Sequence, residues 1–140
     1  MGSDKLNTKE WLNRARTLDK EIDALESARV KAMERCLSIT AKPRDIVVSG
    51  GVSDQDSRLV AYADLSRQID EMVDKLCDTK TEILKAIQTV DDGTLRTLLV
   101  ERYINIKTWE QIAVDMNKSY QWVCELHGRA LEKVLLLDGN

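Results

Sequence analysis

The chain has 140 residues and a mass of 15.9 kDa, which allows one modest domain or a small domain on a long helical arm, and excludes two large globular domains. It contains 43% hydrophobic and 32% charged residues, one proline, six glycines and no phenylalanine, a composition typical of amphipathic helices. The formal net charge is -3, and residues 91–140 carry six Lys/Arg against eight Asp/Glu. This balance argues against a broad basic surface, so any DNA binding would use a local patch, a dimer or a partner.

The sequence also indicates where the protein works. No uninterrupted apolar run approaches the roughly 20 residues that span a bilayer, and the first residues lack the apolar core of a signal peptide. Cys36, Cys77 and Cys124 form no CxxC pair, and the chain has a single histidine. We therefore expect a cytoplasmic protein with free thiols, no metal site and no membrane partner.

A long helix is predicted over residues 8–40. Asn7 or Thr8 can cap it, and apolar residues then recur at alternating spacings of four and three. Most remaining positions are charged, a pattern typical of a helix that pairs with another along one narrow stripe. The stripe consists of Trp11, Ala15, Leu18, Ile22, Leu25, Arg29, Ala32 and Cys36, with Arg29 as its one charged interruption.

A second long helix is predicted over residues 57–90. Both helices would be about 50 Å long at about 1.5 Å per residue, and equal lengths favour an antiparallel coiled-coil hairpin. The connection, residues 41–56, contains Pro43 and a glycine pair, which interrupt helices, and is long enough to let the helices pair with another protomer instead. We expect residues 1–91 to form this arm and to supply any homodimer contact. The second stripe consists of Tyr62, Leu65, Ile69, Met72, Leu76, Thr79, Ile83, Ile87 and Val90.

Residues 92–140 are predicted to form a separate domain of three short helices. The first follows a break at Asp91-Asp92-Gly93, takes Thr94 as its cap and runs to about Tyr103. The sequence TWEQ at residues 108–111 is a capping box that starts the second helix.

A tight turn then separates the second helix from the third. Asn117 suits a left-handed end of the second helix, and Ser119 is the predicted cap of a third helix that runs to about Leu135. A short helix, a tight turn and a longer capped helix form a helix-turn-helix, in which the start of the second of these helices faces the major groove.

The run LLVERYINIKTWEQIAVDMNKSYQWVCELHGRALEKV resembles region four of bacterial sigma factors, through Leu-x-x-Arg-Tyr, Trp-Glu-Gln-Ile-Ala and Arg-Ala-Leu. It covers about a quarter of the chain. The long helices before it and the sequence LHGRAL resemble small phage proteins of the ArpU/RinA type, which regulate late transcription in prophages of Gram-positive bacteria. The resemblance implies a phage or prophage DNA-binding transcription regulator of late genes.

The resemblance also implies a set of DNA-contacting residues. Gln pairs with adenine edges and Glu accepts from cytosine, which suits base reading by Gln121 and Glu125. Sigma factors have Arg where this chain has Tyr120 and Cys124, so their promoter element is not carried over. The implied base-reading positions are Tyr120, Gln121, Cys124 and Glu125, and those at or near phosphates are Thr108, Lys118, Ser119 and Arg129.

Simpler interpretations exist for several residues outside this set. Tyr103 and Trp109 fit the core of a small domain, and Trp122 fits packing on the long helices. The lone His127 fits a structural or surface position.

Two other functions stay open. A phage DNA-packaging subunit of the small terminase kind also combines a helix-turn-helix with helical oligomerisation elements. An RNA polymerase-binding protein without its own DNA specificity would use the same module for a protein contact. An enzyme is not expected, because the sequence shows no nucleophile with a base and no metal cluster, and Ser49-Gly50-Gly51 lacks the Lys-Ser/Thr of a phosphate loop. We therefore expect no catalytic residue and no cofactor.

Overall fold

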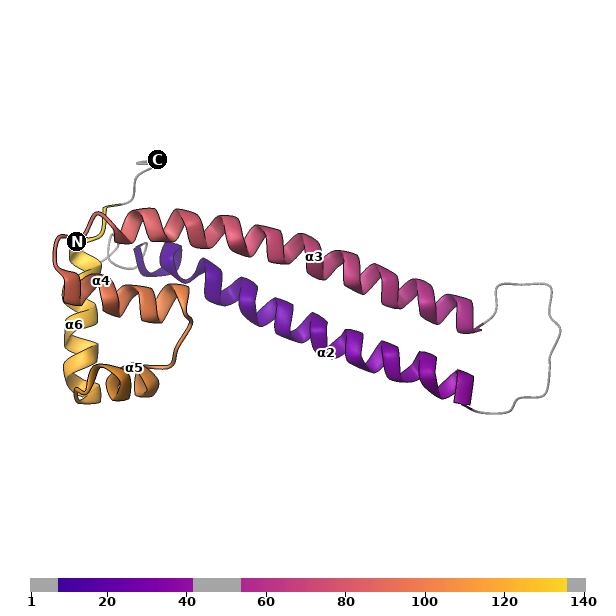
Figure 1. Cartoon of the computed structure of the whole chain (residues 1–140). Coiled ribbons are helices and arrows are strands. Elements are labelled where there is room, and N and C mark those ends of the chain that lie inside the picture. The colour runs from indigo at the N-terminus through magenta and orange to yellow at the C-terminus, as the bar shows by residue number, and fades with distance from the viewer. Residues whose placement is uncertain (1–7, 42–53, 136–140) are drawn as a thin grey trace. The chain divides into compact units, whose positions relative to one another are not determined.

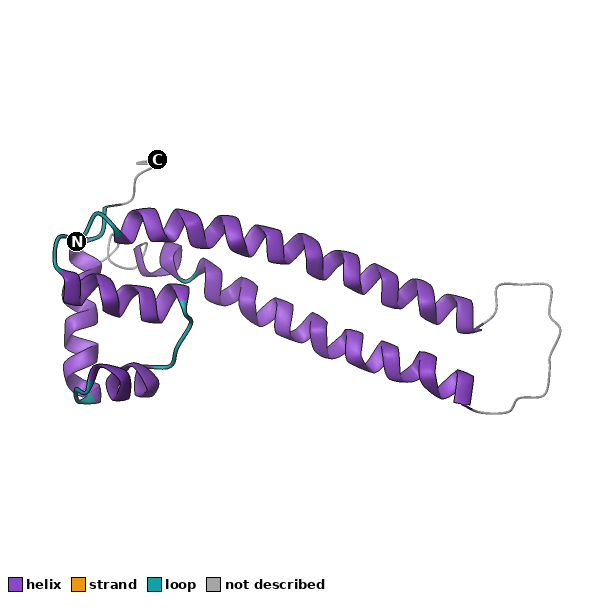
Figure 2. Ribbon diagram, viewed as in Figure 1, coloured by secondary structure: helices purple, strands orange, loops and turns teal. Residues whose placement is uncertain are grey.

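The computed structural model describes residues 8–41 and 54–135, and in these ranges every secondary-structure element is a helix and none is a strand (Figure 2). A short helical stretch over residues 8–12 comes first. It is followed by α2 (Arg14–Ala41), α3 (Asp54–Ile87), α4 (Gly93–Leu99), the π-helix η1 (Val100–Ile104), α5 (Trp109–Met116) and α6 (Tyr120–Lys133) (Figure 1). The predicted all-helical class is confirmed for the described residues.

The long helices begin and end within a few residues of the prediction. Asn13 forms a turn that separates α2 from the helical residues before it. α3 starts at Asp54, three residues earlier than predicted, since acidic side chains favour a helix N-terminus. It ends at Ile87, three residues early, where the Thr89 hydroxyl donates to the Ala86 carbonyl at 2.6 Å.

The predicted loop is shorter than expected at both ends. Ala41 still belongs to α2, and residues 54–56 already belong to α3. The remainder of the predicted loop, residues 42–53 with Pro43 and the glycine pair, lies outside the described residues.

Burial along both long helices follows the predicted stripes. Every stripe position described in either helix is buried or half-buried, including the charged Arg29, which is half-buried. The stripe residues that are buried are Ala15, Leu18, Ile22 and Cys36 in the first helix and Ile69, Leu76, Thr79, Ile83, Ile87 and Val90 in the second.

The chain divides into two compact units. The first contains the described residues 8–18 and 76–135, so it includes the beginning of α2, the end of α3 and all the shorter helices. The second contains the described residues 19–41 and 54–75, and in it the Arg58 guanidinium donates to the Arg35 carbonyl at 3.3 Å.

The first short helix, α4, begins two residues earlier than predicted. Asp92, and not Thr94, is its N-cap, because the Asp92 carboxylate accepts from the amides of Thr94 at 2.8 Å and Leu95 at 3.2 Å. A carboxylate is as good a cap as a hydroxyl and also suits the positive end of the helix. The helix continues directly into η1, whose Tyr103 is buried.

The next two helices have the predicted caps. Thr108 accepts from the Gln111 amide at 3.2 Å while the Gln111 side chain accepts from the Thr108 amide at 2.9 Å, which completes the capping box of α5. Asn117 ends α5 in the left-handed region, with φ 56° and ψ 46°. Ser119 caps α6 by accepting from the Trp122 amide at 3.0 Å.

One apolar cluster joins α4, α5 and α6. Leu98, Ile112, Ala113 and Val123 are buried together. The half-buried Trp109, Met116, Trp122 and Leu126 pack against them, so the two tryptophans belong to the edge of this core. The cluster fixes the relative positions of the three short helices, because each helix contributes at least one buried side chain.

Candidate nucleic-acid interface

Most residues expected to contact DNA lie on α6 or directly before it, and Thr108 lies at the start of α5. Ser119, Tyr120, Gln121, Glu125 and Arg129 are exposed, and half of the Tyr120 side chain is open to solvent. The buried residues of the same helix are Val123, His127, Ala130 and Leu131. Since successive helical residues are rotated by about 100°, Gln121, Glu125 and Arg129 lie on a face away from these buried residues. Tyr120 comes seven residues before His127, so it lies on the same side of the helix as His127 and is exposed at the first turn.

Cys124 differs from its neighbours in this set. It is half-buried, and its thiol is free. Its side chain lies against Tyr120, and this neighbour together with partial burial raises the pKa of the Tyr120 hydroxyl. Tyr120 therefore stays protonated at neutral pH and can donate a hydrogen bond from the first turn of α6.

The two capping hydroxyls at the starts of α5 and α6 are engaged as acceptors. Thr108 and Ser119 both accept from backbone amides, and both are exposed. A hydroxyl that accepts from an amide still carries its own proton, so each can donate to an anion. Lys118, also exposed, lies with its Nζ 5.1 Å from the centroid of the Trp122 ring.

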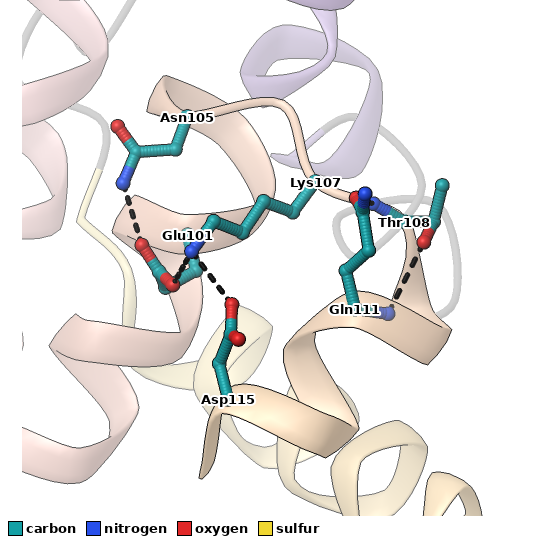
Figure 3. Close-up of polar contacts among 6 residues, drawn as sticks. All are labelled: Glu101, Asn105, Lys107, Thr108, Gln111 and Asp115. Carbon is teal, nitrogen blue, oxygen red and sulfur yellow. Dashed lines mark hydrogen bonds and ion pairs between the residues drawn. The ribbon is translucent and has the colours of Figure 1, made fainter.

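A polar cluster around Lys107 holds the connection between η1 and α5 (Figure 3). The Lys107 ammonium donates to the carboxylates of Asp115, at 2.7 Å, and Glu101. Asn105 also donates to Glu101, at 2.5 Å. Hydrogen bonds to Asp115 and Glu101 raise the pKa of Lys107, so its charge is already compensated and it is not a free phosphate ligand.

This cluster borders an acidic groove on α5. The groove has a volume of about 350 Å³ and is lined by Lys107, Glu110, Gln111, Val114 and Asp115. Its carboxylates outnumber its one cation, so a DNA backbone would be repelled from this side of α5.

Two arginines at the N-terminal end of α5 were absent from the expected site. Arg102, from η1, donates to the Lys107 carbonyl at 3.0 Å, and Arg16, from α2, donates to the same oxygen at 3.5 Å. Arg102 also lies over the Trp109 ring, 4.2 Å from its centroid. Arg102 lies within the run that resembles sigma region four. Arg16 and Lys107 are 91 positions apart, so no local sequence pattern predicts that the two arginines meet.

His127 occupies a structural position, which is one of the two alternatives expected from the sequence. It is buried, and its Nε2 lies 2.5 Å from the Tyr103 hydroxyl oxygen. Its ring packs edge-on against Trp109, with 4.5 Å between centroids. His127 therefore connects α6 to Tyr103 of η1 and to Trp109 of α5.

Within residues 8–41 and 54–135, no group of three His, Cys, Asp or Glu side chains could hold a metal ion. Among the described helices, none has an apolar stretch long enough to cross a membrane. No protein-family model matches this chain, and no curated protein or solved structure shows significant similarity to it.

Proposed function

We propose that this protein is a DNA-binding transcription regulator whose α5, turn and α6 act as a helix-turn-helix. The observation that carries the proposal is the pair of capped helices joined by the left-handed Asn117, with the polar start of α6 exposed. A helix that presents its N-terminal residues to solvent beside a packed partner helix suits entry into a major groove.

The exposed residues give this helix a means of reading bases. Gln121 offers an amide that can pair with an adenine edge, and Glu125 offers an acceptor for a cytosine amine. Neither side chain lies in the core, so both are free to meet a ligand. The resemblance to sigma region four, carried by residues 98–134, supports the same assignment and, with the ArpU/RinA likeness, a role in late genes of a phage or prophage.

The arm has a role in this proposal as the site of self-association. We take α2 and α3 to pair as an antiparallel hairpin, and α2 also carries an apolar row outside its stripe. Val30, Met33 and Leu37 are exposed and follow the three-then-four spacing of a coiled-coil seam. A second copy of the chain, carrying the same row, would cover it, and a dimer would present two recognition helices to two half-sites.

The experiment that tests the function is selection of DNA from a random duplex pool by the purified full-length chain, followed by titration of the recovered site at several salt concentrations. We expect a recurrent motif and an affinity that falls as salt rises, because phosphate contacts release counterions. Recovery of no motif, together with no binding at low salt, would reject DNA binding and favour the polymerase-binding alternative. Rings of many subunits in mass photometry would favour the packaging alternative.

A further inference from the structure

Two guanidinium groups converge on one carbonyl oxygen beside the start of α5. Arg102 Nη1 lies 3.0 Å from the Lys107 carbonyl oxygen, and Arg16 Nη1 lies 3.5 Å from it. Arg102 comes from η1 and Arg16 from α2, and both side chains are half-buried. Two positive charges are therefore held close together by groups that belong to one compact unit.

The charges of this pair are poorly compensated. Among the described residues, neither guanidinium has a carboxylate within 4.0 Å, whereas Arg14, two residues before Arg16, pairs with Glu82 at 2.8 Å. Burial and the charge of Arg16 both lower the pKa of Arg102, and the Glu110 carboxylate opposes them more weakly. An anion placed between the two guanidiniums would relieve their repulsion.

The pair also has donors left for such an anion. A guanidinium carries five N–H donors in a planar fork, and the Lys107 carbonyl takes one from each arginine. The Trp109 ring covers one face of the Arg102 guanidinium and leaves its edges free to donate. Arginine forks match the oxygens of a phosphate group in two-point geometry.

The position of the pair relates it to the exposed start of α6. Thr108, the cap of α5, directly follows Lys107, and the charge of Arg102 acts on the Tyr120 hydroxyl. A duplex that contacts Tyr120 would thus bring its backbone near Arg102, which shares the Lys107 carbonyl with Arg16. The charge of Glu110 acts on both Arg102 and Tyr120, so this carboxylate would oppose a phosphate placed between them.

We propose that Arg16 and Arg102 form a clamp for one backbone phosphate of double-stranded DNA, next to the start of α6. This inference rests on the proposed DNA binding. It adds that α2, which lies outside the three short helices, supplies a DNA contact, so recognition requires the beginning of the arm as well as the helix-turn-helix. The opposing role of Glu110 follows from the same placement.

The test compares full-length variants by fluorescence anisotropy on the selected duplex across a range of salt concentrations. For Arg16→Gln we expect the slope of log affinity against log salt to fall by about 1, as for the loss of one phosphate contact. Gln can still donate to the Lys107 carbonyl, which limits structural damage. Arg16→Lys keeps the charge and should retain most of the slope. Arg14→Gln removes the same charge from the same helix and should leave the slope unchanged.

Glu110→Gln provides a second test, in which the expected change in DNA affinity is opposite to that of Arg16→Gln. Removing this carboxylate should strengthen binding to the selected duplex at low salt. This measurement does not require the arginine variants to be stable. Equal slopes for the parent, Arg16→Gln and Arg14→Gln, with the parent still binding, would overturn the clamp and leave the proposed function intact. Absence of binding by the parent would overturn both. Weaker binding by Glu110→Gln than by the parent would also contradict the clamp.

Discussion

The Tyr103 hydroxyl oxygen lies 2.5 Å from His127 Nε2, which links η1 to α6 through a buried hydrogen bond. Burial, with smaller contributions from the charges of Lys9 and Arg102, lowers the pKa of His127 to about 4. Burial also raises the pKa of Tyr103 to about 12. At neutral pH the pair is therefore an uncharged imidazole and a protonated phenol, which suits a core position.

The lowered pKa of His127 predicts a loss of stability in mild acid. The unfolded chain protonates this imidazole near pH 6.5, but the folded chain resists protonation until about pH 4. Stability from this group is complete above pH 6.5 and declines as pH falls to 4, by up to about 3 kcal/mol. Urea unfolding at several pH values should show this decline in the parent protein.

His127→Gln is the control for this prediction. Gln keeps a polar group near Tyr103 but does not titrate, and the carboxylates that also titrate in this range remain in both proteins. The difference between the two unfolding free energies should therefore shrink as pH falls from 6.5 to 4. A difference that is constant across this range would contradict the assignment.

Two substitutions of Ser119 should separate its capping role from its DNA role. Ser119→Ala removes the acceptor of the Trp122 amide and should lower the free energy of unfolding by about 1 kcal/mol. Ser119→Asp keeps a good cap and should preserve stability, but it places a carboxylate where a phosphate would approach. We expect much weaker DNA binding for the Asp variant than for the Ala variant. The opposite order would place the duplex elsewhere.

Gly128 offers a stabilising change within α6. A Cβ added at this helical position would meet no atom within 4 Å. Gly loses more backbone entropy than Ala on folding, so Gly128→Ala should raise the free energy of unfolding by about 0.5–1 kcal/mol. Denaturant unfolding at constant pH would measure the gain. A loss of stability would indicate that the site requires the smaller residue.

The sequence predicted the helices and most of their caps because those features depend on neighbouring residues. The Thr108 capping box, the left-handed Asn117 and the Ser119 cap each need only a few consecutive side chains. The cap of α4 was misassigned because Asp92 and Thr94 are both good caps, and only the backbone geometry selects Asp92.

The pairings between distant segments could not be predicted in the same way. Arg16 meets the Lys107 carbonyl across 91 residues, and Tyr103 meets His127 across 24. Such contacts depend on how helices pack, and periodicity within one helix does not determine this. The exposure of Gln121, Glu125 and Arg129 could be predicted, because these residues lie away from the apolar stripe of α6. Cys124 lies next to that stripe and is half-buried.

The proposed self-association of the arm predicts the behaviour of a double variant. Val30→Lys with Leu37→Lys places two charges in the exposed apolar row of α2 and should convert a dimer into a monomer in light scattering. Ala24→Lys, at an exposed position on another face of the same helix, should leave the dimer intact. A parent protein that is monomeric at micromolar concentration, or a double variant that still dimerises, would reject this row as the interface.

Gln121 and Lys118 should differ in the kind of defect that their loss produces. Gln121→Ala should cost about 1–3 kcal/mol on the selected site and relax the preference for one base, because an exposed amide on α6 would read a base edge. Lys118→Ala should weaken binding to all sequences and reduce the salt slope by about 1, as for a phosphate contact. Circular dichroism should stay helical for both, since both side chains are exposed. If Gln121→Ala binds the selected site as tightly as the parent, α6 does not read DNA as proposed.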